Sequence, residues 1–286
     1  MKIEWVAPSP ELRPLVHTFY LIDSGSDTID EPTPAYSAQL VVFLEGAVEL
    51  EYEDLPTFRN DALLLSAPRL VAGRVRIEQR VRAAGASLTP LGWAALTGLP
   101  VHKVHDCPVE SDVYASHELV DKIAAWRTRP GRDSGTLRQG LDHIEAILNA
   151  ARHPVSQRNR AFIEQFHQWL TSDLNPPLSK LYDRLPLGER QIQRLSRQFF
   201  GAAPSQVSMR HRAIRIAMLL SNPDLPQAMR EDLVATYFDQ AHLIRSIRRF
   251  TGRTPVSLAS TSLTKATLDP QGHGGNAAVF HQSPET

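Results

Sequence analysis

A chain of 286 residues is long enough for two domains that each bury a sizeable core. Its 31 Lys and Arg residues balance 31 Asp and Glu residues, which excludes a uniformly basic or uniformly acidic protein. The single cysteine excludes an intramolecular disulfide, and no apolar run is long enough for a signal peptide or a membrane span, so we expect a cytoplasmic protein with no membrane partner.

Residues 1–110 are predicted to form a strand-rich domain. The continuous apolar run Leu40–Leu44 predicts a strand that is buried on both faces. Apolar residues alternate with glutamates from Val48 to Tyr52 and with arginines from Val75 to Val81, which predicts half-exposed strands. We interpret the charged faces of these strands as solvated surfaces rather than as ligand sites.

His102, His105 and Cys107 form the pattern H-x-x-H-x-C, whose residue types are those of metal ligands. A fourth ligand is absent nearby, and prolines flank the segment, so we interpret it as an ordinary loop. Cys107 also lacks the paired cysteine or basic setting of a reactive thiol. The sequence therefore predicts no metal, no cofactor and no redox site.

Residues 111–157 are predicted to be a helical connector. Ser111 and Asp112 are expected to cap a helix that continues to about Trp126. A second helix is marked by apolar residues at helical spacing, namely Leu137, Leu141, Ile144 and Leu148. We expect this stripe to pack on the N-terminal domain, and dimerisation through it is the alternative. Residues 152–157 are the predicted interdomain joint.

Residues 158–258 contain an internal repeat with an offset of 51 residues. RQIQRLSRQFFGAAP (Arg190–Pro204) returns as the second part of DQAHLIRSIRRFTGRTP (Asp239–Pro255). The matched pairs are Arg194 with Arg245, Arg197 with Arg248, Phe199 with Phe250, Gly201 with Gly252, and Pro204 with Pro255. A helix-compatible stretch precedes each copy by a few residues, so the pattern predicts two helix-turn-helix units.

Each copy is predicted to be an amphipathic helix with a basic outer side. In the second copy, Leu243, Ile247 and Phe250 recur at helical spacing, and Gly252 is placed to end the helix. In the first copy, Ile192, Leu195 and Phe199 take the inward side. Residues 160–258 hold 14 Lys and Arg against 8 Asp and Glu, so the basic excess lies where a phosphate-binding surface would be needed.

Residues 160–258 resemble the DNA-binding domain of AraC/XylS-type transcriptional regulators, on the strength of the two quoted motifs. The resemblance implies two helix-turn-helix units bridged by a long helix, here Pro204 to about Asn222. It assigns base contacts to Arg190, Gln193 and Arg194 in the first unit and to Gln240, Ala241, His242 and Arg245 in the second. Arg197 and Arg249 point outward beside these residues, and we add them to the expected DNA-binding set.

The run Ser87–Glu110 shows a looser similarity to a segment that ends the N-terminal domain in this family. The expected fold class is therefore α+β, with a strand-rich regulatory domain before an all-α domain and a disordered tail over residues 259–286. The expected partners are double-stranded DNA and a small-molecule effector, with RNA polymerase if the protein is an activator, and a homodimer is plausible from the family.

The sequence departs from the family pattern at both turns and once inside a recognition helix. Thr236 stands where the second turn usually has glycine, Pro186 and Gly188 occupy the first turn, and Ser196 stands opposite Ile247 in the repeat. These departures keep open a partner-binding protein that has lost specific DNA readout. An enzyme is not expected, because no phosphate loop, Cys–His pair or carboxylate pair has a suitable spacing.

Overall fold

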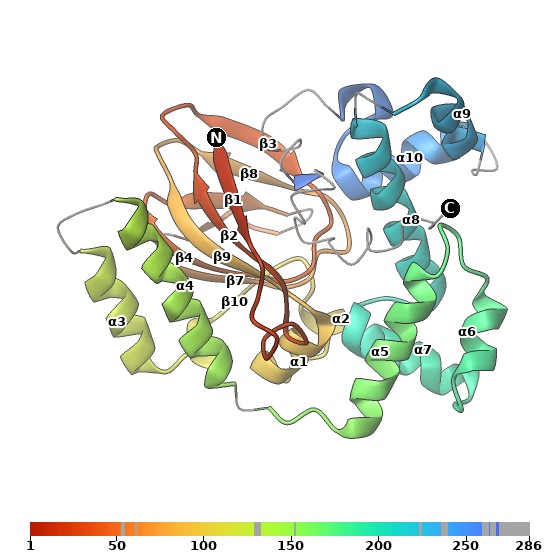
Figure 1. The fold of residues 1–286 in the computed structure, drawn as a ribbon, viewed down its shortest axis with the longest axis horizontal. Helices are drawn as coiled ribbons and strands as arrows, with labels where there is room; N and C mark the ends of the chain where they lie inside the picture. Colours follow the sequence, from red (N-terminus) through yellow and green to blue (C-terminus); the bar gives the residue numbers. More distant parts are fainter. Residues whose placement is uncertain are drawn as a thin grey trace.

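The structure, a computed structural model, describes residues 1–52, 55–60, 62–128, 133–151, 153–222, 225–235, 240–258, 263, 267 and 268. A strand-rich N-terminal part is followed by a helical C-terminal part, and the two lie side by side (Figure 1). This arrangement confirms the predicted α+β fold class. No helix in these ranges is long and apolar enough to cross a membrane.

Two antiparallel sheets form the N-terminal part. The larger has the spatial order β1 (Lys2–Val6), β2 (Val16–Asp23), β9 (Arg82–Leu88), β4 (Gln39–Glu45), β7 (Leu63–Ser66) and β10 (Pro108–Val109). The smaller has the order β3 (Ile29–Thr33), β8 (Gly73–Ile77), β5 (Val48–Glu51) and β6 (Phe58–Asn60). Strand β4 is buried on both faces, as its apolar run predicted. The alternation predicted a strand that continues to Val81. Strand β8 ends at Ile77, so Val81 lies outside it.

Helices cover the face of the larger sheet that points away from the smaller one (Figure 1). They are α1 (Pro90–Thr97), α2 (Val101–Val104), α3 (His117–Arg127) and α4 (Ser134–Asn149), with a short 3-10 turn at Ser111–Val113. The predicted helix start at Ser111 was wrong, because the Ser116 hydroxyl accepts a hydrogen bond from the Leu119 amide and caps α3 there. The apolar stripe of α4 packs on the larger sheet, which confirms the predicted packing on the N-terminal domain.

Strand β9 brings α4 unusually close to the larger sheet. Its centre holds only small residues, Ala83 to Ala86, and all of them are buried. A Cβ atom on Gly140 of α4 would lie 2.7 Å from the Ala84 Cβ, and a Cβ atom on Gly85 would lie 2.1 Å from the Tyr20 ring. Both faces of β9 therefore accept no larger side chain without movement of a neighbour.

The C-terminal part consists of α5 (Gln157–Thr171), α6 (Leu178–Arg184), α7 (Glu189–Phe200), α8 (Pro204–Ser221), α9 (Gln227–Ala235), α10 (Gln240–Thr251) and a 3-10 turn at Pro255–Ser257. Helix α8 joins two hydrophobic clusters, one for each predicted helix-turn-helix unit. The aromatic residues of α5 lie in the first cluster, where Phe166 stacks on Phe200 with ring centroids 4.3 Å apart. These rings are core residues, as predicted.

Three residues of the segment predicted to be a disordered tail are described. Leu263 is buried among the side chains between the two sheets, and Leu268 is buried in the cluster around α8 and α10. Because most residues after residue 258 are polar, the sequence does not indicate that these two leucines are buried. The other residues of this segment lie outside the described ranges.

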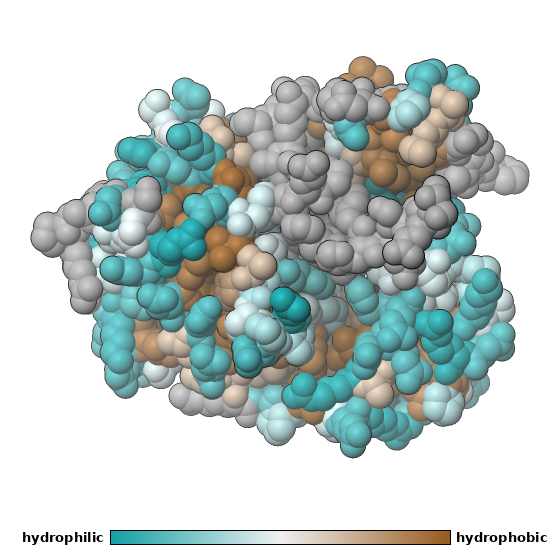
Figure 2. Space-filling model, in the orientation of Figure 1, coloured by the Kyte–Doolittle hydropathy of each residue, from teal (hydrophilic) through white to brown (hydrophobic). Residues whose placement is uncertain are grey.

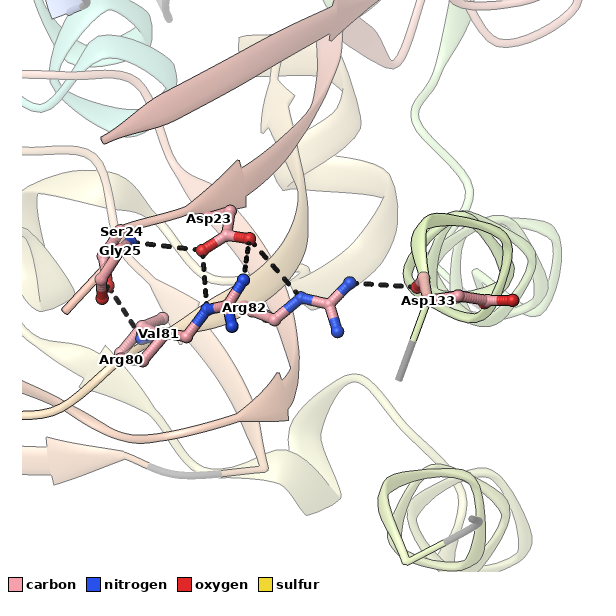
Figure 3. Close-up of polar contacts among 7 residues, drawn as sticks. All are labelled: Asp23, Ser24, Gly25, Arg80, Val81, Arg82 and Asp133. Atoms are coloured by element: carbon pink, nitrogen blue, oxygen red, sulfur yellow. Dashed lines mark hydrogen bonds and ion pairs between the residues drawn. The ribbon is translucent and has the colours of Figure 1, made fainter. Parts of the chain in front are cut away.

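A polar network joins the end of β2 to the start of α4 (Figure 3). The Asp23 carboxylate accepts two hydrogen bonds from Arg80, at 2.9 and 2.6 Å, and one from the Gly25 amide. The bonds from Arg80 are the main cause that lowers the pKa of Asp23. The nearly buried Arg82 guanidinium lies 3.7 Å from the same carboxylate and donates to the Asp133 carbonyl at 2.9 Å. Asp23 thus compensates a buried charge at the joint between sheet and helix.

We predict that Asp23→Asn lowers the free energy of unfolding by about 1.5–3 kcal/mol, because it removes the charge-assisted hydrogen bonds from Arg80 and a negative charge beside the nearly buried Arg82. Chemical denaturation of the full chain measures this loss. Asp27→Asn is the matched control, because Asp27 is exposed, and it should change stability by less than about 0.5 kcal/mol. Equal losses in both variants would contradict the role given to Asp23.

Candidate nucleic-acid interface

Helices α7 and α10 have the same length and the same termination, in the register of the sequence repeat. Each has 12 residues and begins 51 positions from its counterpart. Gly201 and Gly252 follow them with φ of 86° and 71°, the left-handed conformation that glycine adopts without strain. The structure therefore confirms two copies of one helical unit.

Each of the two helices buries the apolar stripe that the sequence indicated. Ile192, Leu195 and Phe199 of α7 are buried, and so are Leu243, Ile247 and Phe250 of α10. Leu243 and Phe250 are the repeat equivalents of Ile192 and Phe199. Ser196, which departs from the repeat, is also buried, but its hydroxyl donates to the Ala202 carbonyl at 2.7 Å. Because this polar group is satisfied, the departure does not disturb the helix.

The first turn accommodates its unusual residues. The Leu187 amide donates to the Leu185 carbonyl at 2.8 Å, and Pro186 is exposed between them. Gly188 is the N-cap residue of α7. Its φ is −68°, so this turn needs no residue in the left-handed conformation. The second turn, with Thr236, lies outside the described residues.

The outer side of α7 is basic and accessible. Arg190, Arg194 and Arg197 are exposed and Gln193 is half-buried, so all four predicted residues lie away from the core stripe. The Arg194 guanidinium is 3.5 Å from the Gln198 side-chain oxygen, a long contact that leaves most of its donors available. Hydrophilic residues also dominate the visible surface over α5, α6 and α7 (Figure 2).

The outer side of α10 combines basic and apolar residues. Ala241, Arg245 and Arg249 are exposed and His242 is half-buried, whereas the side chain of Gln240 lies outside the described set. The Arg249 guanidinium lies 5.4 Å from the centroid of the Phe250 ring, which holds it near the end of the helix.

Ile244 of α10 was missed in the sequence, and Arg248 was placed off the apolar stripe but left out of the expected DNA-binding set. Ile244 keeps 40% of its surface exposed, and Arg248 is exposed on the same helix. The available signal was position: an isoleucine directly after Leu243 falls outside the core stripe, so it must face away from the core. An exposed isoleucine between arginines is suited to an apolar contact with a partner.

The N-terminal part holds α10 at its C-terminal end. The Ala35 amide donates to the Phe250 carbonyl at 2.8 Å, and the Ala72 amide donates to the Arg249 carbonyl at 2.9 Å. These bonds satisfy carbonyls that a helix end leaves free. Just beyond the helix, Arg253 pairs with Glu31 at 3.3 Å, and both side chains are largely buried.

Helix α7 is held at the corresponding point. The His102 imidazole lies 3.3 Å from the Arg197 carbonyl, and the backbone at Gly201 approaches Leu70 and Val101 so closely that a Cβ atom would collide with both. The H-x-x-H-x-C segment thus has structural contacts, with Cys107 donating to the Val104 carbonyl at 3.0 Å. Both helices are fixed at their C-terminal ends, and their accessible candidate residues extend from the N-terminal turns to Arg197 in α7 and Arg249 in α10.

Comparisons with known proteins were made for the whole chain. No family model matches it, and no curated protein matches it. Among solved structures, ToxT from Vibrio cholerae is 8% identical with a TM-score of 0.46, over 83% of this chain and 96% of that chain. The AraC-like transcriptional activator CuxR is 13% identical with a TM-score of 0.30, over 83% of this chain and 88% of that chain. At this similarity the function has to be inferred from the chain's own residues.

We predict that Gly252→Ala lowers the free energy of unfolding by roughly 2–4 kcal/mol. The new Cβ atom would adopt a left-handed backbone and lie 2.4 Å from the Pro32 Cβ in the N-terminal part. Denaturation of the full chain measures the loss. Gly135→Ala is the control, because its Cβ atom would make only an ordinary contact 3.5 Å from Asp133 in the first turn of α4, and it should leave stability unchanged or raise it by up to about 1 kcal/mol.

Proposed function

We propose that the chain is a cytoplasmic transcription regulator of AraC/XylS type that binds double-stranded DNA sequence-specifically. The observation that carries this proposal is the pair of equivalent helices, α7 and α10, which each bury an apolar stripe and present arginines outward. The major groove of DNA admits one α-helix, and two such helices would occupy successive grooves. No catalytic role is proposed for any residue.

The two recognition helices offer different chemistry to DNA. Helix α7 presents Arg190, Gln193 and Arg194 within little more than one turn, and these side chains suit guanine and adenine edges. Helix α10 presents Ala241 and Ile244, which suit the methyl group of thymine rather than a hydrogen-bonding edge. We therefore propose that α7 supplies more base discrimination and that α10 supplies more general affinity through its arginines.

We predict that Gln193→Ala relaxes preference at one or two base pairs, at a cost of about 1–3 kcal/mol for a bidentate contact. Arg249→Ala should weaken binding to all sequences alike and reduce the salt slope by about one unit, as expected for a phosphate contact. Selection from a randomised DNA pool, followed by fluorescence anisotropy at several salt concentrations, measures both effects. An unchanged motif for Gln193→Ala, with a scrambled motif for His242→Ala or Arg245→Ala, would reverse the roles of the helices.

The competing proposal is a partner-binding protein without DNA readout, and salt dependence separates the two. Binding to DNA through phosphates releases counterions, so the affinity must fall steeply as salt rises. An affinity for duplex DNA that does not change with salt would favour the partner-binding alternative.

We further propose that the N-terminal part binds a small-molecule effector between its two sheets. A cavity of about 180 Å³ lies there, with apolar walls from both sheets, including Val41, Phe43, Leu50 and Val75. Tyr20 and Gln39 face it and hydrogen-bond each other at 2.9 Å. Largely apolar walls with a few polar groups are typical of small-molecule sites.

Arg69 indicates which end of this cavity takes a polar group. Its side chain is only 4% exposed, donates to the Thr33 hydroxyl and stacks 4.4 Å from the Tyr52 ring centroid. Within the described residues no carboxylate pairs with it. A buried guanidinium without a counter-charge is costly, so a ligand with an apolar body and an anionic end fits the cavity.

The same two loops connect this cavity to α10. Thr33 and Arg69 contact each other at the cavity, while Ala35 and Ala72 hold the end of α10 a few residues further along. A ligand that moves Arg69 would therefore displace the anchor of the second recognition helix. This supports an effector that binds the DNA-competent and DNA-incompetent states unequally.

We predict that Val41→Phe abolishes the increase in melting temperature that a medium-chain carboxylate produces, because the larger ring fills the cavity. The DNA affinity of the ligand-free variant should remain within about twofold, since Val41 lies in β4 and belongs to neither proposed recognition helix. Leu55→Phe is the control, because Leu55 is exposed and does not line the cavity. A ligand response that survives Val41→Phe would place the effector elsewhere.

A further inference from the structure

A second cavity lies between the N-terminal part and the first helix-turn-helix unit, separate from the cavity between the sheets. Its volume is about 110 Å³, enough for several water molecules or a small organic molecule. His17 of β2 and Trp93 of α1 line it from the N-terminal part, and His167 of α5 with Arg210 and His211 of α8 line it from the helical part.

Three imidazoles in this cavity have unused hydrogen-bonding capacity. In the described part of the chain, the ring nitrogens of His17, His167 and His211 have no hydrogen-bond partner. All three rings line the same cavity, and His167 acts electrostatically on both His17 and His211. Burial lowers the pKa of His17 to about 4 and that of His211 to about 3, so both are neutral near pH 7 and each carries one N–H donor.

Arg210 adds a positive charge to the same cavity. Its guanidinium donates to the Arg69 carbonyl at 2.9 Å, and no carboxylate within the described residues forms an ion pair with it. Burial lowers its pKa to about 10, so it stays charged near pH 7. Asp106, with which Arg210 also lines a second hollow, acts in the opposite direction. The cavity therefore combines one cation with neutral N–H donors.

This donor set favours an anion over a metal ion. The residues that line the cavity include no aspartate or glutamate. Among the residues that the structure describes, no group of three His, Cys, Asp or Glu side chains is arranged to hold a metal ion. A guanidinium and imidazole N–H groups are donors that match carboxylate oxygens. Trp93 and Phe200 provide apolar walls beside them.

We propose that this interdomain cavity binds a small organic carboxylate, with the carboxylate against Arg210 and the imidazoles and a short apolar body against Trp93 and Phe200. Because the donors come from both parts of the chain, the bound anion stabilises the contact between the N-terminal part and the first helix-turn-helix unit. The site does not depend on the proposed DNA binding, so it is tested without DNA.

The first experiment titrates the full chain with butyrate and follows the histidine ring signals by NMR and the heat of binding by calorimetry. Saturable binding that shifts the signals of His17, His167 and His211 is the expected result. Butanamide has the same size without the charge, and inorganic phosphate has charge without the apolar body, and both should bind at least tenfold more weakly. Binding of butanamide as tight as that of butyrate would overturn the proposal.

Substitutions of the lining residues then test whether butyrate binds in this cavity. Arg210→Gln should weaken butyrate binding by about tenfold or more, because a charge-assisted hydrogen bond is lost. Arg210→Lys should retain part of the affinity, and His17→Gln gives an independent loss if Arg210→Gln disturbs the domain contact. Arg158→Gln, on the exposed face of α5, is the control with unchanged affinity. Unchanged affinity in both Arg210→Gln and His17→Gln, or a loss in Val41→Phe instead, would overturn the assignment to this cavity.

Discussion

The burial of one apolar stripe on each of α7 and α10 is the constraint on which the outward placement of their arginines depends. Successive helical residues are rotated by about 100°, so inward placement of Leu243, Ile247 and Phe250 decides that Arg245 faces outward. The same rule places Arg194 outside in α7. An insertion of one residue within either stripe would rotate the residues that follow it by about 100° relative to those before it, which would cost both packing and the cationic surface.

A second level of organisation comes from the ends of these helices. Each ends at a left-handed glycine whose missing Cβ lets the chain approach the N-terminal part, Gly201 at Val101 and Gly252 at Pro32. The sequence repeat therefore includes the two glycines that approach the N-terminal part as well as the outward-facing arginines. Since each anchor is a short segment of the N-terminal part, a rearrangement there would tilt the helices about their C-terminal ends and move their N-terminal turns.

Local patterns were readable in the sequence, and contacts between distant segments were not. The stripe of α4 and the caps of α7 and α10 depend on residues a few positions apart, so periodicity found them. The start of α3 at His117 depended on which of two serines caps it, and both fit the pattern. The bond from Arg210 to Arg69 and the burial of Leu268 leave no periodic trace, because their partners are far away in the chain.

Strand β9 has a consequence for how such a protein can change over evolution. Alanines and Gly85 separate the Tyr20 ring on one side from helix α4 on the other, so a larger residue at the centre of β9 pushes on one layer or the other. If the cavity holds the proposed effector, substitutions that change its ligand preference fit more easily on the smaller sheet, where buried residues alternate with more exposed ones. The two walls of one cavity thus differ in how they accept substitutions: crowding restricts the residues of β9, and the smaller sheet has more room.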